Sequence, residues 1–481
     1  MPNEETPRVS IAYGGFKPGE LRRALWLILI AWFFGASFSG IVSGAAIISF
    51  LTKYLKTNDL QFALIMAAGP VAVAFQFLGS FVTERTGRTK VNFLIFVTLH
   101  RLLWIGVALV PICLMHATST VQIWAVGIII FLSAAIANYG GAGWPTWMSE
   151  IIPRSLAGRF FGIRSSLGMV AMVVIGTAVS YLLDRFDGQG WMYALVFAVA
   201  GIMGAVDILS FLPIRDLQRP PDTTGTPLLS LLVLPWKEVG FRNYLFYMFI
   251  AWISYNCMGP FVGRYCMDAV KNQGMAMNVS MTNIVLFVVP ILAMAVFSPF
   301  WGRAVDKLGP RSVLAASSLM AVIVPLGWLF MRPGWFWQVV VLSIIGGITW
   351  PGVDQATVFM QIKGFPQQYN SVFNATFLVV SGIAGTVGIF IGGLLATFWQ
   401  HNLHYLAPYL PVWVSHYHPV FATAIVVRLA ALVFLFPRLR LPGQGRLAQV
   451  PGVVLDGLID ATPGIGDLVR IWRRRTQKMS A

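Results

Sequence analysis

Charged residues are scarce in this chain. Asp, Glu, Lys and Arg together make up 11% of its 481 residues, whereas hydrophobic residues make up 57%. Soluble domains are nearer 25% charged, so this composition excludes a water-soluble protein of this length. Cysteine is scarce too, because Cys113, Cys257 and Cys266 are too scattered for a disulfide framework or a metal cluster.

The sequence also lacks the common motifs of catalysis and nucleotide binding. It contains no HExxH, no Walker-type loop and no CxxC pair. We therefore expect no enzymatic activity, no catalytic residues, no bound metal and no cofactor. Any transport by this chain then has to draw on a gradient of solute or ions.

Long apolar runs dominate what is present. Each run supplies the roughly 20 residues that cross a hydrocarbon core, and helices pair their own backbone groups there. We predict an all-α membrane protein with twelve transmembrane helices at 24–52, 60–83, 91–115, 121–148, 159–185, 191–213, 243–270, 279–301, 312–331, 335–361, 370–398 and 418–437. They form two six-helix bundles, residues 1–213 and 243–438, joined by a cytoplasmic central loop at 214–242 and followed by a cytoplasmic basic tail at 439–481.

The distribution of basic residues predicts the orientation. With the N-terminus inside, cytoplasmic segments hold 26 of the 34 Lys and Arg, the opposite side holds six, and Arg101 and Arg428 lie within helices. This bias places both termini in the cytoplasm. Basic loops beside an anionic leaflet also account for the net charge of +16 without nucleic acid. We expect an integral protein of the plasma (inner) membrane that is a monomer.

Three ordered matches relate the two halves. The first pairs the loop Ser80–Arg88 with Gly302–Arg311, each of the form small-x-x-x-acid-base-x-Gly. The second pairs Val196–Ala198 and Pro213 with Val420–Ala422 and Pro437. The third pairs Gly140–Pro145 with Gly346–Pro351. Matches in the same order indicate an internal duplication with parallel repeats.

On these motifs, the chain resembles the major facilitator superfamily over residues 20–438. That family has two six-helix halves and a loop of the form G-x-x-x-D-[RK]-x-G-[RK]-[RK] after its second helix, often echoed after the eighth. The second copy here fits well, whereas the first has Ser80 and Glu84 in place of glycine and aspartate. The tail at 439–481 has no counterpart in this resemblance.

The two loops carry their own chemistry. A small residue lets helices approach closely, and the glycine after the acid-base pair suits a turn with positive φ. The resemblance implies a cytoplasmic gate that holds the halves together, and the alternative is that the bases only set topology. The gate residues are Glu84, Arg85, Gly87, Arg88, Gly302, Asp306, Lys307, Gly309 and Arg311.

Ionisable groups at membrane depth are costly and mark functional hypotheses. Asp354 follows Trp350-Pro351, where we expect a break in the helix, and it either binds substrate or a proton or pairs with a loop arginine. Asp207 and Arg101 suit a buried ion pair better than a coupling site. Arg428 is expected to extend its charged end toward the interface.

The resemblance implies a central cavity lined by helices 1, 4, 7 and 10. Aromatic, amide and hydroxyl side chains there suit an uncharged polar solute such as a sugar, whereas Arg164 suits an anion if it faces inward. The alternative for each is helix packing or a place at the interface. The candidate substrate residues are Trp32, Asn138, Tyr139, Trp144, Arg164, Trp252, Tyr255, Asn256, Trp350, Asp354, Gln355 and Asn374.

Two further segments stand out. His401, His404, His416 and His418 crowd the external loop before the last helix, where they bind zinc, sense pH or simply face water. The tail from Val453 to Arg475 forms either a helix on the inner leaflet or a disordered basic segment.

The function we predict is a secondary active transporter, or symporter, that moves a small organic solute by alternating access. Proton coupling through Asp354 is a hypothesis. Efflux of drugs or metabolites is the alternative, weakened because the antiporter glycine-proline signature is not evident within Gly158–Tyr181. A rival of another class is a non-transporting receptor or assembly factor on the same scaffold. The partners are the solute, the lipid bilayer and, if coupling holds, protons.

Overall fold

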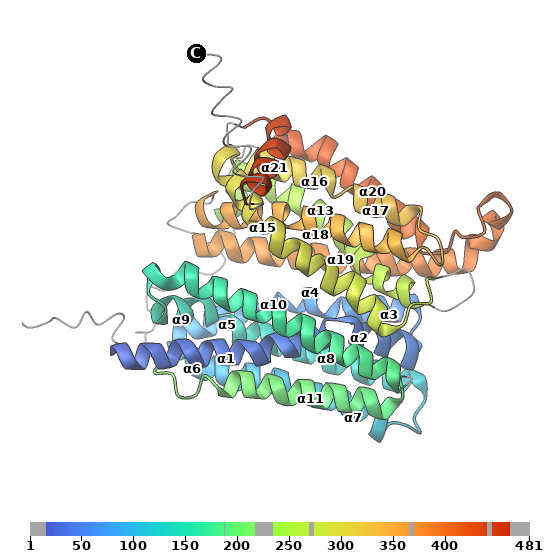
Figure 1. Ribbon diagram of the computed structural model, residues 1–481. Helices are drawn as coiled ribbons and strands as arrows, with labels where there is room; N and C mark the ends of the chain where they lie inside the picture. The colour runs from blue at the N-terminus through green and yellow to red at the C-terminus, as the bar shows by residue number, and fades with distance from the viewer. Residues whose placement is uncertain are drawn as a thin grey trace, which may run out of the picture. The chain divides into compact units, whose positions relative to one another are not determined.

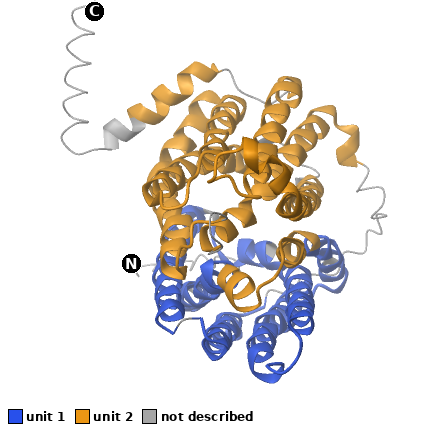
Figure 2. Ribbon diagram, turned by 90° about the vertical axis from the view of Figure 1, so that its right-hand side faces the viewer, with its two compact units in different colours: residues 1–47, 72–225 blue, residues 48–71, 226–481 orange. Residues whose placement is uncertain are grey.

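A computed structural model describes residues 16–186, 188–216, 234–268, 274–364, 370–439 and 445–461. The chain divides into two compact units, shown in different colours in Figure 2. Unit 1 contains residues 1–47 and 72–225, and unit 2 contains residues 48–71 and 226–481. The end of the first apolar helix and the start of the second therefore belong to unit 2, together with the second half of the sequence.

Twelve helices in the described residues are long and apolar enough to cross a membrane, which confirms the predicted all-α class. They run Gly19–Tyr54, Asp59–Thr83, Thr89–Cys113, Ser119–Gly141, Ser155–Arg185, Gly190–Leu209, Val239–Met267, Val279–Leu308, Pro310–Leu329, Phe336–Ile362, Val372–Tyr409 and His418–Arg438. Each overlaps a predicted span. Most of the central loop, residues 217–233, lies outside the described residues, so its predicted structure is not addressed.

The α-helices up to residue 216, labelled in Figure 1, are α1 (Pro18–Val42), α2 (Ala45–Ser49), α3 (Asp59–Met66), α4 (Ala68–Ala72), α5 (Phe75–Thr86), α6 (Thr89–Asn92), α7 (Thr98–Cys113), α8 (Ser119–Gly141), α9 (Trp144–Ile151), α10 (Arg154–Arg185) and α11 (Gly190–Leu209). In unit 1, α1 packs on α10 and α11, α7 lies between α8 and α11, and α5 packs on α8. An apolar cluster that includes Phe93, Trp147 and Phe211 forms part of the core.

The later α-helices are α13 (Val239–Met267), α14 (Val279–Asn283), α15 (Val289–Leu308), α16 (Pro310–Met320), α17 (Ile323–Leu329), α18 (Phe336–Phe359), α19 (Asn370–Leu406), α20 (His418–Ala430) and α21 (Val450–Ala461). In unit 2, α13 packs on α19 and α20, α18 packs on α15 and α16, and α3 packs on α19. Short π-helical turns at Phe50–Tyr54, Phe93–Val97, Ile284–Val288, Met360–Gly364 and Ala431–Leu435 join or extend these helices.

Glycines bring several of these helices close together. A Cβ at Gly79 on α5 would lie 2.0 Å from the carbonyl oxygen of Tyr139 on α8. A Cβ at Gly347 on α18 would lie 2.6 Å from the carbonyl oxygen of Pro290 on α15. Lipid offers no hydrophobic driving force between helices, so such close backbone packing is what holds them together.

The two Trp-Pro motifs differ in structure. The predicted span 121–148 ends at Gly141, and Trp144-Pro145 begins the separate helix α9. By contrast, α18 continues from Phe336 to Phe359 with Pro351 inside it. The predicted break at Pro351 is therefore wrong, because the neighbouring helices hold this stretch helical despite the lost backbone N–H.

The start of the basic tail packs against unit 2. The Gly445 N–H donates to the carbonyl of Leu308 at 3.1 Å, and Val450 and Val454 on α21 are buried in the core of this unit. The helix predicted from Val453 thus begins at Val450 and contacts α15 and α16. Residues 462–481, with the tail's arginine cluster, lie outside the described residues.

Candidate functional site

A cavity of about 470 Å³ lies inside unit 2. Its walls come from α13, α15, α17, α18 and α20, together with the π-helical turn at Ile284–Val288 and Ile48. Four predicted substrate residues line it: Trp252, Tyr255, Asn256 and Trp350. The first three recur at i, i+3 and i+4, the spacing that places side chains on one face of a helix.

Three aromatic rings form one wall of this cavity. The ring centroids of Trp252 and Trp350 are 5.8 Å apart, those of Tyr255 and Trp350 are 5.3 Å apart, and both pairs meet edge to face. The indole Nε1 of Trp252 is buried and has no hydrogen-bond partner among the described residues. The wall therefore offers apolar ring surface together with an N–H donor that the described protein groups leave unused.

Among the described residues, Arg428 is the charged one that lines the cavity. Its Nε donates to Ser254 Oγ at 3.1 Å, its Nη1 donates to the carbonyl of Ala321, and its guanidinium lies 4.3 Å from the ring centroid of Tyr255. The residue is 4% exposed, so the expectation that it extends to the interface is wrong. Arg428 lies ten residues into its span of 21 residues, too deep for its guanidinium to reach the interface.

Other predicted substrate residues do not line the cavity of unit 2. Asp354 is exposed and forms no ion pair among the described residues, so the predicted pairing with a loop arginine is not seen there. Gln355 Nε2 donates to Ser298 Oγ at 3.2 Å and joins α18 to α15. Asn374 Nδ2 donates to the carbonyl of Gln361 at 3.3 Å. Both amides hold helices or turns together.

In unit 1, Arg164 lies between two predicted aromatic residues. Its guanidinium carbon is 3.7 Å from the ring centroid of Trp32 and 4.9 Å from that of Trp144. Among the described residues it has no hydrogen bond and no ion pair, and the Trp32 Nε1 also has no partner there. Cation–π contacts of this kind hold a guanidinium in place while leaving its donors available.

The predicted ion pair between Arg101 and Asp207 is confirmed. Arg101 Nη2 lies 2.9 Å from Asp207 Oδ2, and the Arg101 guanidinium lies 4.0 Å from the ring centroid of Phe38. Of the predicted substrate residues on α8, Asn138 donates from Nδ2 to the carbonyl of Ala134 in the same helix, and Tyr139 meets Phe96 edge to face.

The two loop motifs share a positive φ at the glycine, although ψ is 1° at Gly87 and 161° at Gly309. Gly87 has φ of 66° and Gly309 has φ of 84°, which confirms the prediction of a positive φ after each acid-base pair. The close approach predicted at Gly302 is wrong, because a Cβ there would meet nothing within 4 Å among the described residues. Arg88, Asp306, Lys307 and Arg311 are exposed, and Arg85 lies over Phe81 at 4.3 Å. The side chain of Glu84 lies outside the described residues.

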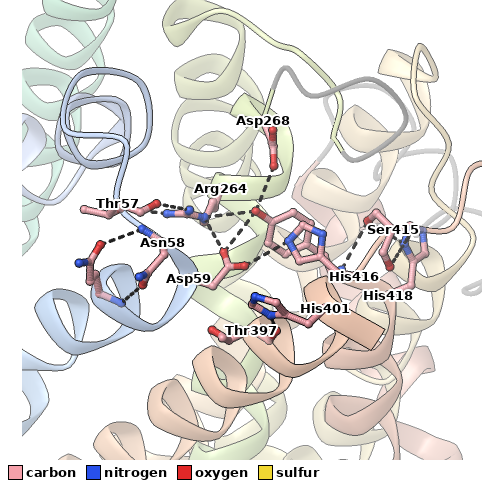
Figure 3. Close-up of polar contacts among 12 residues, drawn as sticks. Thr57, Asn58, Asp59, Arg264, Asp268, Thr397, His401, Ser415, His416 and His418 are labelled. Atoms are coloured by element: carbon pink, nitrogen blue, oxygen red, sulfur yellow. Dashed lines mark hydrogen bonds and ion pairs between the residues drawn. The ribbon is translucent and has the colours of Figure 1, made fainter. Parts of the chain in front are cut away.

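A buried polar cluster in unit 2, which we call the Asp59 network, was missed by the sequence interpretation (Figure 3). Asp59 Oδ1 lies 2.7 Å from Arg264 Nε, and Asp59 Oδ2 lies 3.2 Å from His416 Nε2. Arg264 also donates to the Thr57 hydroxyl at 3.0 Å and to the Thr57 carbonyl at 2.5 Å. The network thus joins the start of α3, the end of α13 and the segment before α20.

Tyr417 completes this network. Its hydroxyl lies 3.2 Å from Arg264 Nε, 3.4 Å from Asp59 Oδ1 and 3.2 Å from Asp268 Oδ2. Burial raises the pKa of Tyr417 well above its ordinary value of 10.0, although the nearby Arg264 opposes this rise. Tyr417 therefore remains a neutral phenol that accepts from Arg264 and donates to a carboxylate.

The four histidines predicted in the external loop divide into two pairs. His401 and His404 lie on α19 rather than in a loop, whereas His416 precedes α20 and His418 begins it. His401 and His404 are exposed, whereas His416 and His418 are 3% and 2% exposed, so the expectation of a wholly wet loop is wrong. His418 Nδ1 accepts from the Ser415 N–H at 2.9 Å, and its Nε2 lies 3.2 Å from the Met331 carbonyl, which fixes a neutral tautomer. Among the described residues, no three His, Cys, Asp or Glu could together hold a metal ion.

Comparison with known proteins agrees with this architecture. Residues 270–475 match the family model of the Major Facilitator Superfamily. Over these residues the chain is similar to that superfamily. The match extends into the tail, beyond the limit of the resemblance noted in the sequence. No curated protein sequence matches the chain.

Solved structures of superfamily transporters share the fold. A mutant of the nucleoside transporter NupG matches with a TM-score of 0.66 and 14% identity. The match covers 87% of this chain and 100% of that one. An auto-inhibited peptide transporter of the POT family matches with a TM-score of 0.63 and 14% identity, over 89% and 99% of the two chains. A D-xylose-proton symporter matches with a TM-score of 0.61 and 12% identity, over 88% and 99%. These matches show that the chain shares the fold of these solved transporters.

Proposed function

We propose that this protein is a secondary active transporter that moves a small organic solute by alternating access, and that the cavity of unit 2 holds the solute. The observation that carries the proposal is the cavity itself. Its volume of about 470 Å³ falls in the usual range for small-molecule sites, and it combines aromatic walls with a few polar groups. Trp252, Tyr255, Asn256 and Trp350 are the proposed contacts.

The proposed orientation places both termini in the cytoplasm of a plasma-membrane monomer. Its support is the excess of Lys and Arg, 26 against six, in the segments assigned to that side. In this orientation the Asp59 network lies at the external end of unit 2, and the loops with Gly87 and Gly309 lie at the cytoplasmic end. We assign the gate role to these two loops.

Alternating access requires the halves of the sequence to move against each other. Residues 48–71 come from the first half, yet they belong to unit 2 and carry Asp59 into contact with Arg264 and His416. Opening toward the outside would have to break these contacts. The Asp59 network is therefore proposed to stabilise the externally closed state.

Accessibility labelling tests transport against a static receptor or assembly factor. In a background without native cysteine, Ser343→Cys places a thiol in the cavity, and Val341→Cys on the same helix is the matched exposed control. A transporter should let an impermeant maleimide reach position 343 from each side in turn, with a ratio that changes when solute is added. Labelling from one side only, whatever solute is present, contradicts the proposal.

Proton coupling is proposed to run through Asp354, which supports symport of solute with protons. Asp354 lies one helical turn beyond Trp350 on the same face of α18 and forms no ion pair among the described residues. Asp354→Asn should abolish uptake driven by a proton gradient while leaving solute exchange intact, and Asp306→Asn is the matched control. Full gradient-driven uptake by Asp354→Asn in proteoliposomes would reject this coupling site. Transport of the solute outward but not inward would favour efflux instead.

A further inference from the structure

Arg428 differs from Arg264, the other buried arginine among the described residues of unit 2. Both residues are less than one-tenth exposed, but Arg264 has the carboxylate of Asp59 at 2.7 Å. Arg428 forms no ion pair among the described residues, and no acidic residue among them lines the cavity. A guanidinium keeps its charge in proteins, so this cavity holds an unbalanced positive charge at membrane depth.

The contacts of Arg428 leave part of its donor set unused. Nε and Nη1 donate to Ser254 and Ala321, and one face of the guanidinium lies against Tyr255. Nη2 has no hydrogen-bond partner among the described residues, although Arg428 lines the cavity. The protein thus fixes the guanidinium in place and leaves donors for something that is not part of the described chain.

The number of charges limits what can bind. A single guanidinium balances one negative charge, and the remaining lining is neutral, with rings, small side chains, Asn256 and Thr349. A dianionic phosphate would leave one charge uncompensated, whereas a carboxylate would not. The aromatic wall of Trp252, Tyr255 and Trp350 suits an apolar or aromatic remainder.

We propose that the cavity of unit 2 binds a monocarboxylate with an apolar or aromatic body, and that Arg428 receives the carboxylate. This assignment rests on the proposed function, because it names the class of solute in the same cavity. It also makes Arg428 the residue that selects for charge, while the aromatic wall selects for shape.

Calorimetric titration of the full-length protein in detergent tests the proposal with probes that differ only in charge. The pairs are benzoate with benzamide, phenylacetate with phenylacetamide, and hexanoate with hexanamide. At least one carboxylate should bind about 10- to 100-fold more tightly than its amide, the range expected for hydrogen bonds to a charged group. Equal or tighter binding of the amides would overturn the assignment, and so would no binding of any carboxylate at millimolar concentration.

Variants then locate the effect. Arg428→Gln should remove the preference for the carboxylate and leave the weak binding of its amide unchanged. A melting curve confirms that this variant is folded. Ser254→Ala is the control, because it removes a contact of Arg428 while keeping the charge, and it should keep the preference. If Arg428→Gln does not fold, the carboxylate and amide pairs titrated into the wild-type protein test the proposal by themselves. A preference that survives Arg428→Gln contradicts the role of this residue.

An anionic lipid is a second source of negative charge, and nanodiscs distinguish it from a soluble solute. Carboxylate binding should be the same in phosphatidylcholine discs with and without phosphatidylglycerol. Loss of binding in the presence of phosphatidylglycerol would assign the cavity to a lipid headgroup and overturn the proposal. If the labelling of position 343 alternates but the amides bind best, the transporter proposal stands and the anion assignment fails. If the labelling of position 343 does not alternate but a carboxylate binds tightly, the anion assignment stands and the transporter proposal fails.

Discussion

Asp59 Oδ1 and Arg264 Nε lie 2.7 Å apart, although 205 residues separate them in the sequence. Asp59 is 1% exposed and Arg264 is 8% exposed, so water contributes little to stabilising either charge. Removing one partner from such a pair leaves a buried charge without compensation. Breaking the pair therefore costs more free energy than the intact pair contributes to folding.

A double-mutant cycle should reveal this asymmetry. Asp59→Asn and Arg264→Gln should each destabilise the protein by about 3–5 kcal/mol, and the double variant by clearly less than their sum. Denaturation in detergent measures all four corners of the cycle. Arg332→Gln is the control, since Arg332 is exposed and stacks on Trp335 and Trp413. Additive costs would show that the pair does not act as a unit.

Alkaline titration should expose the buried phenol of Tyr417. Because burial raises the pKa of Tyr417 in the folded state, the unfolded chain releases this proton first as the pH rises past about 10. The stability advantage of wild type over Tyr417→Phe should therefore be constant below pH 9 and shrink above pH 10. Thermal melts of both proteins from pH 8 to 11 measure the difference in their stability. The ionisation of the other tyrosines affects both proteins alike and cancels in this difference. An advantage that grows with pH would show that Tyr417 ionises in the folded protein.

Glycine substitutions should separate close packing from open positions on the second apolar helix. Gly79→Ala places a methyl group 2.0 Å from the carbonyl oxygen of Tyr139, so α5 and α8 must move apart. We expect a loss of about 1–3 kcal/mol, as for other overpacked sites. Gly69→Ala is the matched control, because nothing among the described residues lies within 4 Å of its new methyl group. A stability equal to wild type for Gly79→Ala would contradict the packing of α5 on α8.

The loop after the eighth span offers a second matched pair. Gly309 has φ of 84° and ψ of 161°, a region that costs a non-glycine residue roughly 1–3 kcal/mol. Gly309→Ala should lower the melting temperature, whereas Gly302→Ala should be neutral or slightly stabilising, because alanine favours the helix and its methyl group meets nothing. Equal effects of the two changes on melting would argue against the positive φ at Gly309.

Part of the candidate site follows from local patterns. Trp252, Tyr255 and Asn256 share a helical face because of their spacing, and Trp350 belongs to a repeated motif, so all four were predicted and all four line one cavity. Asp354 and Gln355 follow Trp350 closely in sequence but do not line the cavity. Whether a side chain on such a helix faces a cavity, a neighbour or lipid depends on how the helix is rotated, which its own apolar sequence leaves open.

The sequence by itself determined the twelve spans, because runs of about 20 apolar residues must form helices that satisfy their own backbone in lipid. It also determined the positive φ at Gly87 and Gly309, which is a local property of the backbone. Only the tertiary structure decided where the charges go. Asp59 meets Arg264 and His416, and Arg428 enters the cavity beside Tyr255, through contacts between residues far apart in the chain. These contacts depend on how the helices pack, and no local pattern specifies that.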